Sequence, residues 1–249
     1  MAFKKMAKDR TQFPISGDGT VPHELITVSD REGDAHYDFS PNDVASVSGE
    51  GGCYYFRCRN GLTLEVRWHS ERMLRVRYAL DGRFESDFSY ALSPSFHAEA
   101  LTSVQLEQTP DAFCLRSSRL RCFIDKKDLR VHLADASGQW LCRERRGFFA
   151  RQTILRGKIR LAISKERNAE DAYYGLGDKT GPLNLNGSAY ENWNTDAFCY
   201  GPKTDPLYKT IPFYYGLKDG LAYGIYLDNT YRSRFDFGKT DPEETVFEA

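Results

Sequence analysis

The sequence predicts an all-β protein whose strands form an antiparallel β-sandwich. Two features of the 249-residue chain predict this fold class. Apolar and polar residues alternate at a period of two in several short segments, as expected for strands with one buried face. In addition, no stretch of a dozen residues carries the apolar stripe of an amphipathic helix. Many short strands separated by turn residues are typical of a sandwich or a barrel.

The N-terminal part of the chain has the weakest pattern. Residues 1–48 are rich in Asp, Ser, Gly and Pro and show little periodicity. This composition predicts a weakly structured segment with one or two short edge strands. Residues 49–249 contain no internal repeat and no low-complexity linker. We therefore expect them to form a single β-sandwich domain.

The first well-marked strands form a predicted hairpin. Residues 53–58 and 62–68 both alternate between apolar and polar side chains. Asn60-Gly61 lies between them, and both residue types tolerate the positive φ angles of a tight turn. The period of two predicts that the apolar face of this hairpin is buried and that the face carrying Glu65 is wet.

Later segments repeat the same alternation. Asp219-Gly220 marks a second tight turn, so the two segments around it predict another hairpin. The further predicted strands lie at residues 74–78, 120–124, 129–133, 159–163, 211–217 and 221–227.

One long connection interrupts this series of strands. Nearly fifty residues with little alternation separate Ile163 from Ile211. A connection of this length is usually functional or disordered, and its aromatic residues argue against disorder. Aromatic faces beside amides and carboxylates suit a sugar ring, which has apolar C–H faces and hydroxyl edges. We expect a substrate-facing loop at about residues 178–210, with a packed structural loop as the alternative.

Composition argues against several classes of partner. A formal net charge of −1 gives no reason to expect nucleic acid or an anionic membrane as a partner. No segment approaches the ~20 apolar residues of a membrane span, and the N-terminus lacks the apolar run of a signal peptide. The six cysteines form no C-x-x-C pair and no zinc-ligand pattern. We therefore expect reduced thiols, no bound metal and a cytoplasmic protein.

Two features that suggest a phosphate-binding loop or catalytic carboxylates are better explained by structural roles. The run Gly175-Leu176-Gly177-Asp178-Lys179 lacks the spacing of a phosphate-binding loop, and its aspartate would repel phosphate. Asp228 and Asp236 resemble catalytic carboxylates only in residue type. A retaining glycosidase needs two carboxyl groups about 5–5.5 Å apart, and no pattern in the sequence predicts such a pair. Turn and packing roles are therefore expected for both.

Residues 173–238 carry an ordered series of motifs. The series reads Y-Y-G-L-G-D-K-T-G-P-L-N, then W-N-T-D-A, then D-P-L-Y-K-T-I-P-F-Y-Y-G-L, and ends with R-F-D-F-G. It resembles the N-terminal domain of glycoside hydrolase family 31, the family of α-glucosidases and α-xylosidases. Residues 72–78 also resemble a strand of this family. The resemblance implies a galactose-mutarotase-like supersandwich that packs on a (β/α)8 barrel and extends a loop to the rim of the active site.

The resemblance also implies which loop residues contact sugar. In the family, an aspartate of the W-N-x-D-type segment binds the sugar beyond the cleavage point, and Asp196 stands at that position. An ionised carboxylate accepts strong hydrogen bonds from neighbouring hydroxyls. Some relatives have a hydroxyl residue two positions later, where this chain has Phe198, so stacking would replace that contact. Trp193 and Asn194 are candidate supporting residues, and shaping the loop is their favoured role.

The catalytic barrel of the family is expected to be absent from this chain, because no alternating strand and helix pattern follows residue 238. The resemblance implies that the whole enzyme removes a terminal α-linked glucose or related sugar with retention and without a cofactor. This chain would supply a wall of the leaving-group subsite and pack on the enzyme's own barrel. It is also expected to lack a strand after residue 238, which would leave an unpaired edge and favour self-association.

Two other functions stay open at the level of sequence. One is a free-standing carbohydrate-binding module, which would bind sugar without a barrel. The other is a mutarotase-like aldose epimerase, which needs a His and a Glu as acid and base in the concave sheet. His69 and His132 lie in or beside predicted strands. A carboxylate facing either ring would favour the epimerase.

Overall fold

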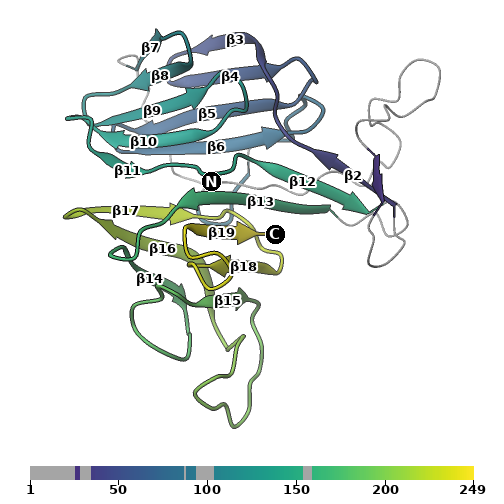
Figure 1. The fold of residues 1–249 in the computed structure, drawn as a ribbon, viewed down its shortest axis with the longest axis vertical. Helices are drawn as coiled ribbons and strands as arrows, with labels where there is room; N and C mark the ends of the chain where they lie inside the picture. The colour runs from purple at the N-terminus through teal and green to yellow at the C-terminus, as the bar shows by residue number, and fades with distance from the viewer. Residues whose placement is uncertain (1–25, 29–34, 87, 94–103, 154–158) are drawn as a thin grey trace.

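A computed structural model describes residues 26–28, 35–86, 88–93, 104–153 and 159–249. Within these ranges the chain forms nineteen strands and no helix. Every strand pair in the described part is antiparallel, as the alternating sequence predicts. Figure 1 shows the strands arranged as two stacked pairs of sheets. The predicted all-β sandwich class is therefore confirmed.

The upper pair of sheets forms one sandwich (Figure 1). Its two layers meet through apolar side chains, with the rings of Phe56 and Phe113 5.3 Å apart. The Tyr54 hydroxyl also donates a hydrogen bond to the Val104 carbonyl, 3.1 Å away. One layer has the order β3 (Val44–Glu50), β4 (Cys53–Cys58), β5 (Thr63–Ser70) and β6 (Met73–Ala79). The other has the order β11 (Trp140–Cys142), β10 (Val131–Asp135), β9 (Leu120–Asp125), β8 (Ala112–Arg116) and β7 (Gln105–Gln108).

The lower pair of sheets packs around an aromatic cluster. The Tyr214 ring lies 5.1 Å from Phe237 and 6.1 Å from Phe235, and Tyr173 stacks on Phe237 at 4.8 Å. The smaller sheet has the order β14 (Ala172–Gly177), β16 (Thr210–Lys218) and β17 (Leu221–Tyr226). The larger sheet has the order β1 (Ile26–Val28), β2 (Ala35–Phe39), β12 (Phe149–Thr153), β13 (Ile159–Glu166), β19 (Glu244–Glu248), β18 (Ser233–Asp236) and β15 (Ala189–Asn192).

The described part of the N-terminal segment already belongs to these sheets. The edge strand β1 pairs with β2, and β2 pairs with β12. The edge strand β3 crosses the expected boundary at residue 48. Residues 1–25 and 29–34 lie outside the described residues, so the expected weak structure of residues 1–48 stays a prediction there.

Both predicted hairpins are present. Strands β4 and β5 pair across Asn60-Gly61, and β16 and β17 pair across Asp219-Gly220. Gly61, Asp219 and Gly220 have φ angles of 88°, 50° and 78°. These positive values match the turn chemistry that the sequence indicated.

The alternation of β5 wrongly predicts a wet face. Glu65 is 0% exposed, and Arg75 and Arg77 on neighbouring β6 are each 6% exposed. Glu65 accepts two hydrogen bonds from the Arg77 guanidinium, at 2.9 and 2.7 Å. The Phe84 ring lies 5.1 Å from that guanidinium and 5.7 Å from Tyr55. This face is charged and buried because its charges neutralise one another.

The strand expected to be missing after residue 238 is present. Strand β19 follows a short turn after β18 and lies between β18 and β13 in the larger sheet. Phe247 on β19 is 1% exposed and stacks on Phe235 at 5.9 Å. The expectation of an edge left open at this point is therefore wrong. The outer strand on this side of the sheet is β15.

Candidate functional site

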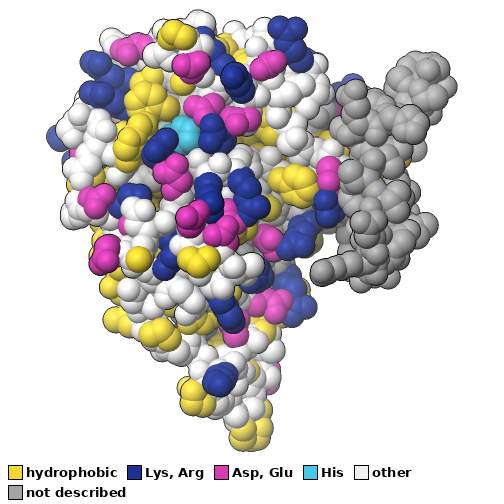
Figure 2. Space-filling view, viewed as in Figure 1, with side chains coloured by type: hydrophobic (Ala, Val, Ile, Leu, Met, Phe, Trp, Pro, Cys, Tyr) yellow, Lys and Arg dark blue, Asp and Glu magenta, His cyan; other side chains and the backbone are white. Residues whose placement is uncertain are grey.

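The loop expected at residues 178–210 projects from the lower end of the molecule, on both sides of β15 (Figure 1). Figure 2 shows hydrophobic side chains at this projecting end, where charged side chains are sparse. The segments of the loop are tied to one another by hydrogen bonds. Thr195 N–H donates to the Leu207 carbonyl at 3.0 Å, and the Tyr208 hydroxyl donates to the Ala197 carbonyl at 2.7 Å. These hydrogen bonds hold the segments of the loop in a defined arrangement.

Asn194 shapes the loop, which was its favoured role in the sequence. Its Oδ1 accepts hydrogen bonds from the backbone N–H of Thr210 at 2.9 Å and from the Thr210 hydroxyl at 2.8 Å. These bonds join the segment just after β15 to the first residue of β16. The Asn194 amide oxygen is thereby committed to Thr210 and is not available to a ligand.

Trp193 is half exposed, and the Arg232 guanidinium lies over one face of its ring. Its side chain has 47% of its surface exposed. The Arg232 guanidinium carbon lies 5.8 Å from the centre of its ring, and the same guanidinium forms an ion pair with Glu191. A cation over an aromatic face stabilises the ring in one orientation. Trp193 is therefore a fixed aromatic surface with part of it open to a ligand.

Asp196 and Phe198 are directed to solvent. Asp196 is exposed, and among the described residues it forms no hydrogen bond or ion pair. Phe198 is 89% exposed. Tyr200 and Tyr208, which the sequence analysis did not single out, stand edge to face nearby in the chain, with ring centres 6.0 Å apart. Their signal in the sequence was the density of aromatic residues in this segment.

A free carboxylate and open aromatic rings on the same loop suit recognition of a carbohydrate. The carboxylate can accept hydrogen bonds from two hydroxyls, and aromatic rings can stack on the apolar face of a sugar. The structure places Trp193, Asn194, Asp196 and Phe198 on one ordered loop, with distinct environments.

The base of the loop borders a shallow depression of about 450 Å³. Tyr190 and Glu191 line it from β15 and Asp205 from the loop. Arg232 lines it from just before β18, Arg234 from β18 and Lys239 from the turn that follows. Lys179 reaches the same part of the loop from the segment after β14. Lys179 and Asp205 both stand within the motif series of residues 173–238, but the sequence pattern assigned a role to neither of them.

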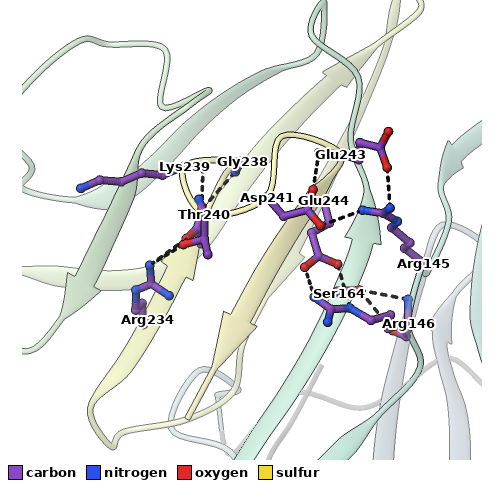
Figure 3. Close-up of polar contacts among 11 residues, drawn as sticks. Arg145, Arg146, Ser164, Arg234, Gly238, Lys239, Thr240, Asp241, Glu243 and Glu244 are labelled. Atoms are coloured by element: carbon purple, nitrogen blue, oxygen red, sulfur yellow. Dashed lines mark hydrogen bonds and ion pairs between the residues drawn. The ribbon is translucent and has the colours of Figure 1, made fainter.

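Asp236 has a structural role, as expected. Its Oδ1 accepts hydrogen bonds from the N–H groups of Gly238, Lys239 and Thr240, and its Oδ2 accepts from the Thr240 hydroxyl and Arg234. Figure 3 labels these four partners. Burial by itself would raise the pKa of Asp236, but these hydrogen bonds lower the pKa below its ordinary value. Asp236 thus caps the turn between β18 and β19 and is not placed to act on a substrate.

The basic residues that precede β12 are tied to the same turn. Arg145 forms ion pairs with Asp241, at 3.0 Å, and with Glu243 (Figure 3). Arg146 pairs with Glu244, and its backbone N–H donates to the Ser164 hydroxyl at 3.0 Å. The ion pairs join residues 96 to 98 positions apart in sequence, so the cluster has a structural role.

His132 meets the carboxylate condition set for an epimerase, but its ring is fully engaged. Its Nδ1 accepts a hydrogen bond from the backbone N–H of Glu144, so Nε2 carries the proton that faces Asp125 at 3.2 Å. Burial lowers the pKa of His132, and only 7% of its side chain is exposed. A neutral buried imidazole with both nitrogens occupied cannot exchange a proton with a sugar. This geometry favours a structural role.

The cysteines and the potential metal ligands of the described residues form no further site. The six cysteines are free, four of them buried. Within the described ranges, no group of three or more His, Cys, Asp or Glu side chains is arranged to hold a metal ion. The part of the chain that the structure describes also has no helix long and apolar enough to cross a membrane.

Comparison with known families now adds to this geometry. Residues 63–236 match the model of the glycosyl hydrolase 31 N-terminal galactose mutarotase-like domain. The match covers most of the chain, including β5 to β18. The chain therefore belongs to this family of domains, and the resemblance stated from its motifs is confirmed.

Individual relatives agree with this assignment. The chain is 29% identical over 197 residues to α-glucosidase 2 of Bacillus thermoamyloliquefaciens, a match that covers 79% of the chain and 24% of the relative. It is 30% identical over 78 residues to the α-xylosidase XylQ of Lactiplantibacillus pentosus, covering 31% of the chain and 9% of the relative. The structure superposes on the GH31 dextranase of Flavobacterium johnsoniae with a TM-score of 0.72 and 28% identity, covering 85% of the chain and 25% of the dextranase. The chain thus spans at most about a quarter of these proteins.

Proposed function

We propose that this chain is the non-catalytic N-terminal domain of an α-glycosidase and that its loop at residues 178–210 forms a wall of the leaving-group subsite. Membership of the GH31 N-terminal domain family supports the first part. The observation that carries the second is the combination of a free, exposed carboxylate at Asp196 with the exposed rings of Trp193 and Phe198 on one ordered loop.

The substrate class follows from the named relatives. These are an α-glucosidase, an α-xylosidase and a dextranase. We therefore propose a terminal α-linked glucose or related sugar as the substrate of the whole enzyme, cleaved with retention by residues outside this chain. The side chains of the loop would bind the part of the substrate that leaves.

The proposed partner of this domain is the catalytic barrel of the same enzyme. One face of the β14–β16–β17 sheet supports this proposal. Ile211, Tyr215 and Leu217 on β16 are 54%, 55% and 41% exposed. The strand register places Ala222 and Tyr226 of β17 on the same side. A sheet face made of large exposed apolar residues is typical of a surface that another domain covers.

The test of the loop's role is Asp196→Ala in the complete enzyme. A lost charge-assisted hydrogen bond is worth about 1.5–3 kcal/mol. We therefore expect kcat/KM for an α-linked oligosaccharide to fall about tenfold to a hundredfold, with a smaller loss for a substrate with a small aryl leaving group. Lys203→Ala, an exposed change on the same loop, is the control. An equal loss on both substrates would refute the placement of Asp196 beyond the cleavage point.

A further inference from the structure

Three passes of the chain meet at the base of the loop, and one buried lysine joins them. Lys179 Nζ donates a hydrogen bond to the Glu191 carbonyl at 2.6 Å and lies 3.3 Å from Asp205 Oδ1. The second carboxylate oxygen of Asp205 accepts the backbone N–H of Glu191 at 2.6 Å. Lys179 therefore bonds to the carbonyl of Glu191 while its partner Asp205 accepts the N–H of the same residue.

The neighbouring residues repeat this connection between the same three passes. The Thr180 hydroxyl donates to the Thr204 carbonyl at 3.0 Å, and the Tyr190 hydroxyl donates to the Thr180 carbonyl at 3.1 Å. Lys179 Nζ also lies 5.9 Å from the centre of the Tyr190 ring. The loop base is thus a small hydrogen-bonded network in which the Lys179 and Asp205 side chains form the ion pair.

Burying the Lys179–Asp205 pair costs free energy, because both charged groups lose contact with water. The Lys179 side chain is 4% exposed and that of Asp205 is 21% exposed. Burial lowers the pKa of Lys179 and raises the pKa of Asp205, and the attraction between the two groups opposes both shifts. Well-packed apolar residues stabilise a fold at least as well as a buried ion pair does. The contribution of the pair is to fix the direction of the two hydrogen bonds to the Glu191 backbone.

A short chain of contacts leads from this pair to the candidate sugar surface. Glu191 stands two residues before Trp193, and its carboxylate pairs with Arg232. The Arg232 guanidinium carbon lies 5.8 Å from the centre of the Trp193 ring. On the other side, Leu207 follows Asp205 by two residues and accepts the hydrogen bond of Thr195. Both ends of the segment that carries Trp193 and Asp196 are thus fixed near the pair.

We propose that Lys179 and Asp205 are positioning residues of the leaving-group subsite. They hold the two stems of the loop together and so set the place of Trp193 and Asp196, without touching the sugar themselves. This inference rests on the proposed function of the loop. Misplacement of a binding group by about 1 Å can cost two orders of magnitude in rate, so a loosened stem is expected to weaken binding on the leaving-group side.

The first test is kinetic and uses Lys179→Met in the complete enzyme. We expect KM for an α-linked trisaccharide to rise about tenfold or more, while kcat for a substrate with a small aryl leaving group stays within about twofold of the parent value. Lys179→Arg, which keeps the charge, should restore part of the affinity. Lys209→Met is the matched control, because Lys209 is on the same loop with its side chain 77% exposed. An unchanged trisaccharide KM, or an equal loss on both substrates, would overturn the proposal.

The second test uses the 249-residue chain and separates the two proposals. Chymotrypsin cleavage after the exposed Phe198 should be at least about tenfold faster in Lys179→Met than in the parent or in Lys209→Met, because a loosened loop opens more often. Asp205→Asn should act in the same direction, which keeps the test valid if one variant fails to fold. Unchanged cleavage in both variants would refute the positioning role. Fast cleavage in both variants, with Asp196→Ala kinetically silent, would show that the pair holds the loop and would reject the loop's place in the leaving-group subsite.

Discussion

Individual charged residues inside the sheets are held by several partners at once. Glu65 is surrounded by Arg77, Arg75 and Arg67, with N–O distances of 2.7, 3.7 and 3.5 Å. Burial alone would raise the pKa of Glu65, but the hydrogen bonds and charge of Arg77, followed by those of Arg67, lower it. The carboxylate is therefore ionised and neutralises a buried group of arginines.

Removing the charge of Glu65 should destabilise the domain strongly. In Glu65→Gln, buried Arg75 and Arg77 lose their counter-ion, and breaking such a pair costs about 3–5 kcal/mol. Urea unfolding followed by tryptophan fluorescence measures the change. Glu107→Gln is the control, because Glu107 and its partner Arg116 have side chains 53% and 47% exposed. A loss no larger than the control's would show that the cluster is not needed for stability.

Asp236 predicts a pH dependence at the level of one residue. Its folded-state pKa is lowered, so the folded protein binds fewer protons there than the unfolded chain does. The stabilisation is therefore complete above the unfolded pKa of about 3.9 and is lost as the pH falls through the folded value.

Asp236→Asn should be less stable than the parent at pH 7 and should lose less stability on acidification. Thermal unfolding at pH values between 3 and 7 tests this expectation. Parallel curves for the two proteins would contradict it. Asn can still accept the backbone hydrogen bonds, so the difference reports the charge and its bonds to Thr240 and Arg234.

At the scale of elements, β14 depends on two glycines in the Y-G-L-G motif. Gly175 has a φ of 138°, and a Cβ there would lie 2.5 Å from the Phe213 carbonyl oxygen on the neighbouring strand. Gly177 has a φ of 81° and would meet the Lys209 carbonyl at the same distance. The pairing with β16 shifts register between these glycines. The motif therefore makes a bulge that starts the loop.

Gly175→Ala should destabilise the fold more than Gly220→Ala. Gly220 also has a positive φ, but nothing lies within 4 Å of its missing Cβ, so the control carries only the backbone strain of about 1–3 kcal/mol. The excess measured by thermal unfolding isolates the clash with β16. Equal losses in the two variants would mean that the neighbouring strand can move away.

The sequence predicted the positions of the strands better than it predicted which of their faces are buried. Alternation and turn residues located most strands, because the period of two is a local property of the chain. It could not decide which face is buried, since that depends on elements distant in sequence. The apolar side of β16 is exposed, while the charged side of β5 is buried. Strand β19 was missed because the Glu-Thr-Val-Phe-Glu segment alternates weakly and gains its interior place only by pairing with β13 and β18.

The candidate site was predictable to a similar degree. The motif located the loop and its exposed residues Trp193, Asp196 and Phe198. It contains Lys179 and Asp205 but did not reveal their pairing, because they are 26 positions apart and meet only in the folded chain. Their contact depends on the path of the loop between them, and no local pattern encodes that path.

At the scale of the whole molecule, the apolar face of β16 and β17 predicts self-association of this chain when it is expressed alone. Ile211, Tyr215 and Leu217 leave large apolar surfaces open to water, and burying such area is favourable. Size-exclusion chromatography should show an apparent mass that increases with concentration. The double change Tyr215→Lys and Leu217→Lys should abolish this increase, while Thr230→Lys, on the loop after β17, should not. A monomer at all concentrations would contradict the expectation.

The central claim is that the chain belongs to an α-glycosidase but carries none of its catalytic groups. Hydrolysis of p-nitrophenyl α-glucoside and α-xyloside, measured for the 249-residue chain and for the product of its complete reading frame, tests this claim most directly. We predict no turnover by the chain and turnover of one of the two glycosides by the longer product. Hydrolysis by purified 249-residue chain would contradict the account, because it would place the catalytic carboxylates within the residues described as structural or substrate-contacting.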